Sequence, residues 1–289
     1  MAKIPDKASQ TLEIPKIILA TSKFLQFISP NLAALFAAKL FTTPVKHKTP
    51  KRELEMDRKS RQQTVTIKSI NKDIVVYRYG EGEKKILLVH GWSGRGTQLV
   101  KFADAFLAAG YSIISFDAPA HGKSPGKTSL MPEFIAGILQ LEQEFGPFEA
   151  AIGHSLGGMS LLNSVKRGLR LKRLVIIGSG DVVQDIIDEF IEKLRLKPEI
   201  GHLMRSHFES KSHEEMDNYS SFRAAREITI PVLVIHDKHD AEVSVRCAQH
   251  IYENLPDGKL MLTEGLGHRK ILGNAEVITK SLDFATSKS

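Results

Sequence analysis

Ser155 is the central residue of a G-x-S-x-G pattern completed by Gly153 and Gly157. A short apolar run, 150–152, precedes the pattern, and a helical pattern, 159–166, follows it. A serine in a tight strand-to-helix turn has strained backbone angles, and the flanking glycines leave room for the turn. The N–H groups of the following helix would stabilise an anion formed at the same point. The pattern predicts a nucleophilic serine, although a glycine-rich turn without chemistry gives the same letters.

A serine hydroxyl becomes a strong nucleophile when a base takes its proton, and histidine, with a pKa of about 6.5, suits that task. Among the eleven histidines, His268 alone follows both the last predicted strand and the acidic candidates, in a glycine-containing loop. A carboxylate must then hold the imidazole in one tautomer. Three aspartates that follow predicted strands compete for this role: Asp181, Asp237 and Asp240.

The net positive charge of the chain lies in its N-terminal segment. Residues 1–63 contain 12 Lys and Arg against 5 Asp and Glu, whereas the remainder contains 28 of each sign. A body without net basic charge argues against a nucleic-acid partner. The single cysteine, Cys247, excludes an internal disulfide and fits a reducing, cytoplasmic compartment.

We predict that residues 1–63 are a basic, helical N-terminal extension. Two short amphipathic helices are expected at about 16–28 and 31–41, and a polar linker at 46–61. No apolar run is long enough for a membrane-spanning helix, and no signal peptide is recognisable. Residues 1–60 could make a peripheral membrane contact. In the alternative, the helices pack on the body, and the following become core residues: Phe24, Phe27, Leu35 and Phe41.

The body, 64–289, has the pattern of an α/β domain. An antiparallel hairpin is predicted at 64–69 and 74–79, and continuous apolar runs predict buried parallel strands beyond it. The long connection 181–229 predicts a helical cap insertion. The further strands are expected at 86–89, 112–116, 150–152, 173–177, 232–235 and 259–263, and helices at 98–109, 132–145 and 275–284.

From Thr64 onward the chain resembles the α/β-hydrolase superfamily, in its lipase/esterase-like branch. The resemblance implies a mostly parallel central sheet with helices on both faces. The family order of nucleophile, acid and histidine implies a triad of Ser155, Asp240 and His268. Some members carry the acid after the preceding strand, which keeps the earlier aspartates as alternatives. The matching segments are His90-Gly91-Trp92, Asp117 to Ser124, Gly153 to Gly158, Asp237 to Val243, and Gly267-His268.

The resemblance also implies an oxyanion hole made by two backbone N–H groups. Leu156, directly after the serine, supplies one, and Trp92 is expected to supply the other. We further expect Trp92 and His154 to contact the substrate. His202, His207 and His213 have spacings of five and six residues, which fit no compact metal site.

The sequence therefore predicts a serine hydrolase that cleaves a small-molecule carboxylic ester through an acyl-enzyme, with no metal and no cofactor. The same triad would support thioesterase, C–C hydrolase or perhydrolase chemistry. A further alternative is a non-catalytic member of the fold that docks through its basic N-terminus. The substrate and the oligomeric state are left open.

Overall fold

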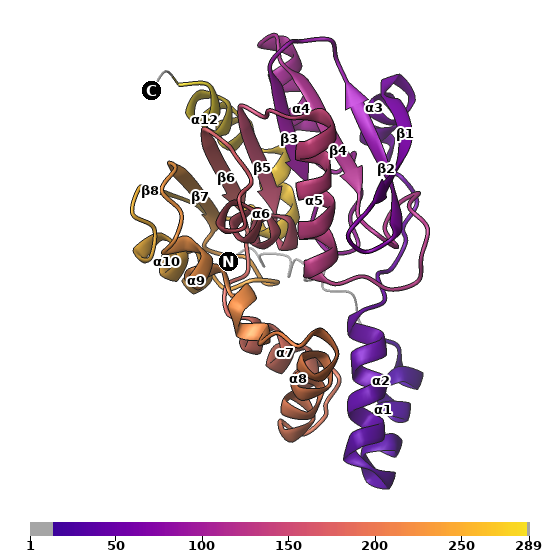
Figure 1. The fold of residues 1–289 in the computed structure, drawn as a ribbon. Coiled ribbons are helices and arrows are strands. Elements are labelled where there is room, and N and C mark those ends of the chain that lie inside the picture. Colours follow the sequence, from indigo (N-terminus) through magenta and orange to yellow (C-terminus); the bar gives the residue numbers. More distant parts are fainter. Residues whose placement is uncertain (1–13, 288–289) are drawn as a thin grey trace, which may run out of the picture.

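The computed structural model describes residues 14–287, in which eight strands form one sheet of order β1-β2-β4-β3-β5-β6-β7-β8 (Figure 1). The β1–β2 and β2–β4 pairs are antiparallel, and the other neighbours are parallel. The strands are β1 (Arg61–Ile67), β2 (Lys72–Tyr79), β3 (Lys85–Val89), β4 (Ser112–Asp117), β5 (Ala150–His154), β6 (Arg173–Ile177), β7 (Val232–Asp237) and β8 (Gly258–Thr263).

The continuous apolar runs became central strands, because helices cover both faces of the sheet. Every residue of β4, β5 and β7 is buried, whereas the edge strand β1 is mostly exposed. The predicted hairpin is confirmed, with Val65 paired to Ile74 in antiparallel register. The α/β fold expected from the alternating strands and helices is therefore present.

Helices form two layers, each with its own apolar cluster against the sheet. One cluster contains residues of α5 (Met131–Phe145), α6 (Leu156–Lys166), α9 (Ser221–Ala225) and α10 (Val245–Glu253). The other contains residues of α3 (Leu54–Lys59), α4 (Val100–Ala108) and α12 (Ala275–Thr286). Between β8 and α12 lies the short helix α11 (Gly267–Lys270), followed by the turn η3 (Ile271–Gly273).

The segment expected to be a linker, 46–61, is partly helical and is anchored to the body. It contains the turn η1 (Lys51–Glu53) and α3, and both contribute buried side chains. Glu53 accepts a hydrogen bond from the Thr97 hydroxyl at 2.8 Å and lies 3.9 Å from Arg95. The contact between Glu53 and Thr97 thus anchors this polar segment to the body. The two residues are far apart in the sequence, so the local pattern does not reveal the contact.

The cap and the N-terminal helices share a third apolar cluster. The cap comprises α7 (Val183–Lys193), α8 (Glu199–Ser212), the turn η2 (Met216–Tyr219) and α9. The N-terminal helices are α1 (Lys16–Ile28) and α2 (Pro30–Phe41), close to the predicted ranges, and α2 packs on α8. In residues 14–287, none of the helices has the length and apolar character required to span a bilayer.

Of the four N-terminal residues that the alternative places in a core, one, Phe41, is partly buried against the cluster. The Phe41 ring packs against Phe190 at 5.2 Å and Phe208 at 6.0 Å between centroids. Phe24, Phe27 and Leu35 are exposed, which contradicts the alternative in which these three are core residues. The helix instead uses small residues for its close contact: Ala33, Ala34, Ala37 and Ala38 are all buried.

Candidate active site

Ser155 lies at the junction between β5 and α6, with φ 53° and ψ −121°. Residues other than glycine rarely adopt a positive φ, and the resulting backbone strain is retained where the surrounding fold imposes it. The Ser155 N–H donates to Ile177 O at 2.9 Å, which ties the turn to the end of β6. Ser155 lines a cavity of about 1110 Å³. This geometry matches a nucleophile elbow.

The two glycines of the G-x-S-x-G pattern are required by close backbone contacts. A Cβ at position 153 would lie 2.7 Å from the backbone of Gly157. A Cβ at position 157 would lie 2.4 Å from Val89 O. Both distances are below any tolerable contact, because strand, turn and helix approach one another at the backbone. The pattern is therefore explained by packing as well as by the exposure of the serine.

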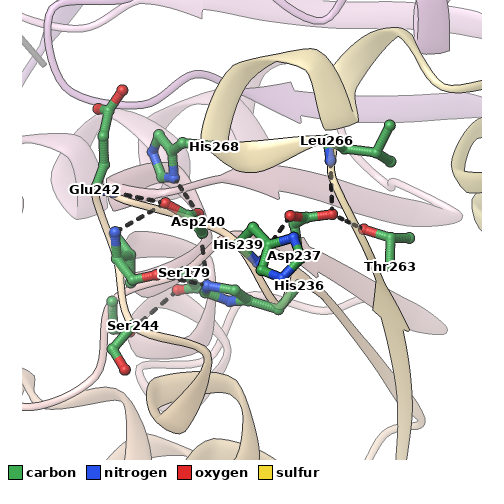
Figure 2. Close-up of polar contacts among 12 residues, drawn as sticks. Ser179, His236, Asp237, His239, Asp240, Glu242, Ser244, Thr263, Leu266 and His268 are labelled. Carbon is green, nitrogen blue, oxygen red and sulfur yellow. Dashed lines mark hydrogen bonds and ion pairs between the residues drawn. The ribbon is translucent and has the colours of Figure 1, made fainter. Parts of the chain in front are cut away.

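His268 and Asp240 form a buried hydrogen-bonded pair (Figure 2). The distance from His268 Nδ1 to Asp240 Oδ2 is 2.7 Å. The other carboxylate oxygen accepts from the N–H groups of Glu242 at 2.8 Å and Val243 at 2.9 Å. The Asp240 side chain is 1% exposed and that of His268 is 7% exposed. The loop after β7 thus holds the carboxylate in one orientation, and the carboxylate holds the ring.

The environment of Asp240 favours its ionised form. Burial raises the pKa of this carboxyl group, but the hydrogen bond from His268 and the two backbone N–H donors outweigh burial and hold the pKa below its ordinary value. A carboxylate that stays charged can stabilise an imidazolium formed during proton transfer. The pair is therefore chemically equipped for base catalysis.

His268 also lies close to the serine turn. A Cβ at Gly178, the residue after Ile177, would lie 3.3 Å from the His268 ring. The His268 ring is 4.6 Å from that of His154, the neighbour of Ser155. No hydrogen bond joins Ser155 to His268 among the described side chains. Catalytic hydrogen bonds of free enzymes are often long and shorten when the substrate binds.

The two competing aspartates have other partners. Asp237 accepts hydrogen bonds from Thr263 Oγ1 and the N–H groups of His239 and Leu266, so it braces the loops after β7 and β8 (Figure 2). Asp181 contacts His250 of α10 instead of His268. Burial raises the pKa of Asp181. The structure therefore places only Asp240 beside the predicted base.

His154 does not contact the cavity, in contrast to the expectation that it binds substrate. It is 2% exposed, and its Nε2 atom lies 2.9 Å from His268 O. Burial lowers its pKa to about 3, so the ring is neutral. A ring packed behind His268 supports the position of that residue. Side chains alternate along a tight turn, and this one points into the protein where Ser155 points out.

Trp92 and Leu156 are the residues expected to supply the two N–H groups of an oxyanion hole. Both line the same cavity as Ser155. Leu156 is the first residue of α6, so its N–H has no carbonyl partner within the helix. The Trp92 N–H likewise donates to no carbonyl among the loops that the structure describes. Two backbone N–H groups without a described acceptor thus belong to residues that line the cavity together with Ser155.

His236 is a site neighbour that sequence reasoning missed. Its Nε2 atom donates to Val243 O at 2.9 Å and lies 3.5 Å from Asp240 Oδ2. It therefore fixes the loop whose N–H groups hold the carboxylate (Figure 2). The residue follows a buried strand directly before an aspartate, and nothing in the letters distinguishes it from a satisfied core histidine.

The cavity above Ser155 has a volume of about 1110 Å³ and is lined mainly by apolar side chains. Its walls come from α2, residues 128–130, the start of α5, α7, α8 and the start of α10. Across residues 14–287, no three potential ligating side chains gather as a metal site would require. Apolar residues of its lining include Leu35, Phe41, Trp92, Met131, Met159, Ile186 and Phe190.

Comparisons with known proteins agree with this architecture. The model of the alpha/beta hydrolase family matches residues 86–277. A pimeloyl-[acyl-carrier protein] methyl ester esterase from Aromatoleum aromaticum is 22% identical over 66% of this chain and 93% of its own length. An esterase from Pyrococcus furiosus has a TM-score of 0.64 at 19% identity, covering 84% of this chain and 95% of that one. An esterase from Exiguobacterium antarcticum has a TM-score of 0.61 at 20% identity, covering 75% and 97%. The family match spans most of the chain, which therefore belongs to the alpha/beta hydrolase family.

Proposed function

We propose that the protein is a serine esterase that cleaves a carboxylic ester through an acyl-enzyme intermediate. The observation that carries the proposal is the strained turn at Ser155, which opens into an apolar cavity beside the Asp240–His268 pair. A scaffold without chemistry has no need for a positive φ at a serine or for a buried carboxylate on a histidine. The esterases among the relatives support the same activity.

In the proposed reaction, the Ser155 oxygen attacks the ester carbonyl while His268 accepts the hydroxyl proton. The N–H groups of Leu156 and Trp92 donate to the oxyanion that forms. The tetrahedral intermediate then collapses, the C–O bond to the alcohol breaks, and His268 gives its proton to the leaving alcohol. Water, activated by the same base, releases the acid and restores the serine. Asp240 keeps the imidazole in the tautomer that both halves require.

The cavity supports an acyl ester with an extended apolar chain as the substrate. Its volume exceeds that needed for an acetyl group, and pockets of about 300–1,000 Å³ commonly enclose whole small-molecule ligands. The apolar walls would gain free energy by removing a hydrocarbon chain from water. A thioester with the same acyl group fits the same geometry, since only the leaving atom differs.

Labelling with a fluorophosphonate probe tests the nucleophile directly. We expect covalent labelling of the native protein and none of Ser155→Ala. Ser164→Ala is the control, because Ser164 is a buried serine of α6, the helix that follows Ser155, and does not line the cavity. A panel of p-nitrophenyl esters and matched thioesters of increasing chain length then defines the acyl preference. Labelling that persists in Ser155→Ala, or a folded protein that the probe never labels, would remove the proposed mechanism.

A further inference from the structure

The N-terminal helices α1 and α2 expose an unusual amount of apolar surface. Among the described residues, six of the nine exposed large hydrophobic side chains belong to these two helices. Phe27 is 90% exposed, Ile17 73% and Phe24 63%. Monomeric soluble proteins rarely expose contiguous apolar surface of this kind unless it serves an interaction. We call the following set the outer face: Ile17, Phe24, Phe27, Ile28, Leu32 and Leu35.

The outer face is built by helical spacing rather than by scattered residues. Ile17, Phe24 and Ile28 are separated by seven and four residues and so lie along one side of α1. A neighbouring side of the helix, about a quarter turn away and carrying Ile18 and Leu25, packs against the apolar cluster that the cap shares with the N-terminal helices. The helix therefore has two apolar sides, and only one of them has a partner within the described chain.

The charged side chains of the two helices that carry the outer face are all positive. Between Ile14 and Pro50 the sequence contains five lysines and no Asp or Glu. Lys16, Lys23 and Lys39 are exposed on the two helices that carry the outer face. Two copies of such a face would bring like charges together, which disfavours self-association. An anionic lipid surface would instead attract the lysines and accept the apolar side chains.

The outer face is continuous with the cavity of the candidate active site. Leu35 is 47% exposed and also lines that cavity, as do Lys39 and Phe41 of the same helix. The cavity wall thus passes from Ser155 to the surface of α2. Figure 1 shows α1 and α2, like α7 and α8, below the sheet in this view, beyond the ends of its strands. Docking through the outer face would place this end of the cavity next to the surface.

We propose that the outer face docks on an anionic lipid bilayer, with α1 and α2 lying at the membrane surface. The apolar side chains enter the region between head groups and acyl chains, and the three lysines contact the anionic head groups. The substrate is then an acyl ester held in the bilayer, whose chain enters the cavity past Leu35. This last step rests on the esterase function proposed above, whereas the docking does not.

Vesicle sedimentation with the full chain tests the docking. We expect binding to vesicles of phosphatidylcholine with phosphatidylglycerol, weaker binding to phosphatidylcholine alone, and loss of the difference at high salt. The double variant Phe24→Ser/Phe27→Ser should bind at least about tenfold more weakly, since two large apolar groups no longer enter the lipid. Tyr252→Ser is the matched control, because it removes an exposed aromatic ring of α10, away from the outer face.

The two serine substitutions are in exposed positions that do not line the cavity, so the fold is expected to stay intact, as circular dichroism can check. Turnover of a water-soluble short-chain ester should be unchanged in the double variant, while turnover of a long-chain ester in anionic vesicles should fall with binding. Equal vesicle binding by native protein and double variant overturns the docking. So does a native dimer that the double variant dissociates without any change in vesicle binding. Vesicle binding that depends on both phenylalanines in a protein without esterase activity would retain the docking and reject the esterase function.

Discussion

His268 Nδ1 lies 2.7 Å from Asp240 Oδ2, although the two residues follow different strands of the sheet. The ends of the parallel strands β7 and β8 are neighbours, so the loops that follow them meet at one edge. One oxygen of the Asp240 carboxylate accepts hydrogen bonds from the backbone N–H groups of Glu242 and Val243, and the other oxygen contacts the ring. Its orientation is therefore fixed by its own loop, and the histidine is positioned by the carboxylate.

Ser155→Ala should lower kcat for ester hydrolysis by about four or more orders of magnitude, since the members of a triad act as a unit. The same position offers a test of backbone strain. Ser155→Gly should be more stable than Ser155→Ala by about 1–2 kcal/mol, because glycine accepts the positive φ that alanine resists. Urea unfolding of the two inactive variants measures this difference. Equal stability would mean that the turn is not strained.

The two candidate acids can be separated by paired substitutions. Asp240→Asn should lower kcat by several orders of magnitude, about 10⁴-fold if the imidazole adopts the wrong tautomer. Asp181→Asn should change kcat far less, because its partner is His250. Steady-state kinetics on one ester give the ranking. A larger loss in Asp181→Asn would transfer the role of the acid to the loop after β6.

Buried histidines should make stability depend on pH. Burial is the main cause that lowers the pKa of His90 to about 4, and those of His121 and His154 to about 3, from the ordinary histidine value of about 6.5. Above pH 6.5 the three rings are neutral in the folded and in the unfolded protein, so their titration does not reduce the free energy of unfolding. As pH falls below that value, the unfolded chain binds protons that the folded protein excludes, and the free energy of unfolding declines until about pH 3–4.

Urea unfolding between about pH 7 and pH 5 measures this decline. His154→Gln removes one titrating ring while keeping a side-chain N–H donor. Its free energy of unfolding should fall less steeply, by about 1.4 kcal/mol per pH unit where the ring would titrate. Parallel pH profiles of the native protein and this variant would show that His154 is not a buried neutral ring.

Leu35→Trp should shift the acyl preference toward short chains, because the larger side chain narrows the cavity where α2 forms its wall. Leu32→Trp is the matched control, as Leu32 is exposed on the same helix and does not line the cavity. We expect kcat/KM for long-chain esters to fall by about tenfold or more in the first variant only, from the loss of chain burial. A preference that both variants leave unchanged would mean that the acyl chain does not reach α2.

The elements of the body could be predicted because their signals are local. Continuous apolar runs of four to six residues predict buried parallel strands wherever they occur in the chain. The helix α10 was not predicted, since its apolar positions are few: Ala248 and Ile251 are its buried residues. The cytoplasmic location inferred from the single cysteine stays a prediction.

The sequence by itself determined the family, the strand order along the chain and the candidate nucleophile, because each depends on residues close together in the chain. Only the tertiary structure decided which aspartate contacts His268 and that His154 lies behind that ring. It also decided that α2 forms a wall of the cavity, since α2 and α8 are far apart in the sequence. Contacts of this kind depend on how separate segments pack, and small residues such as Ala37 permit them without leaving a distinctive local pattern.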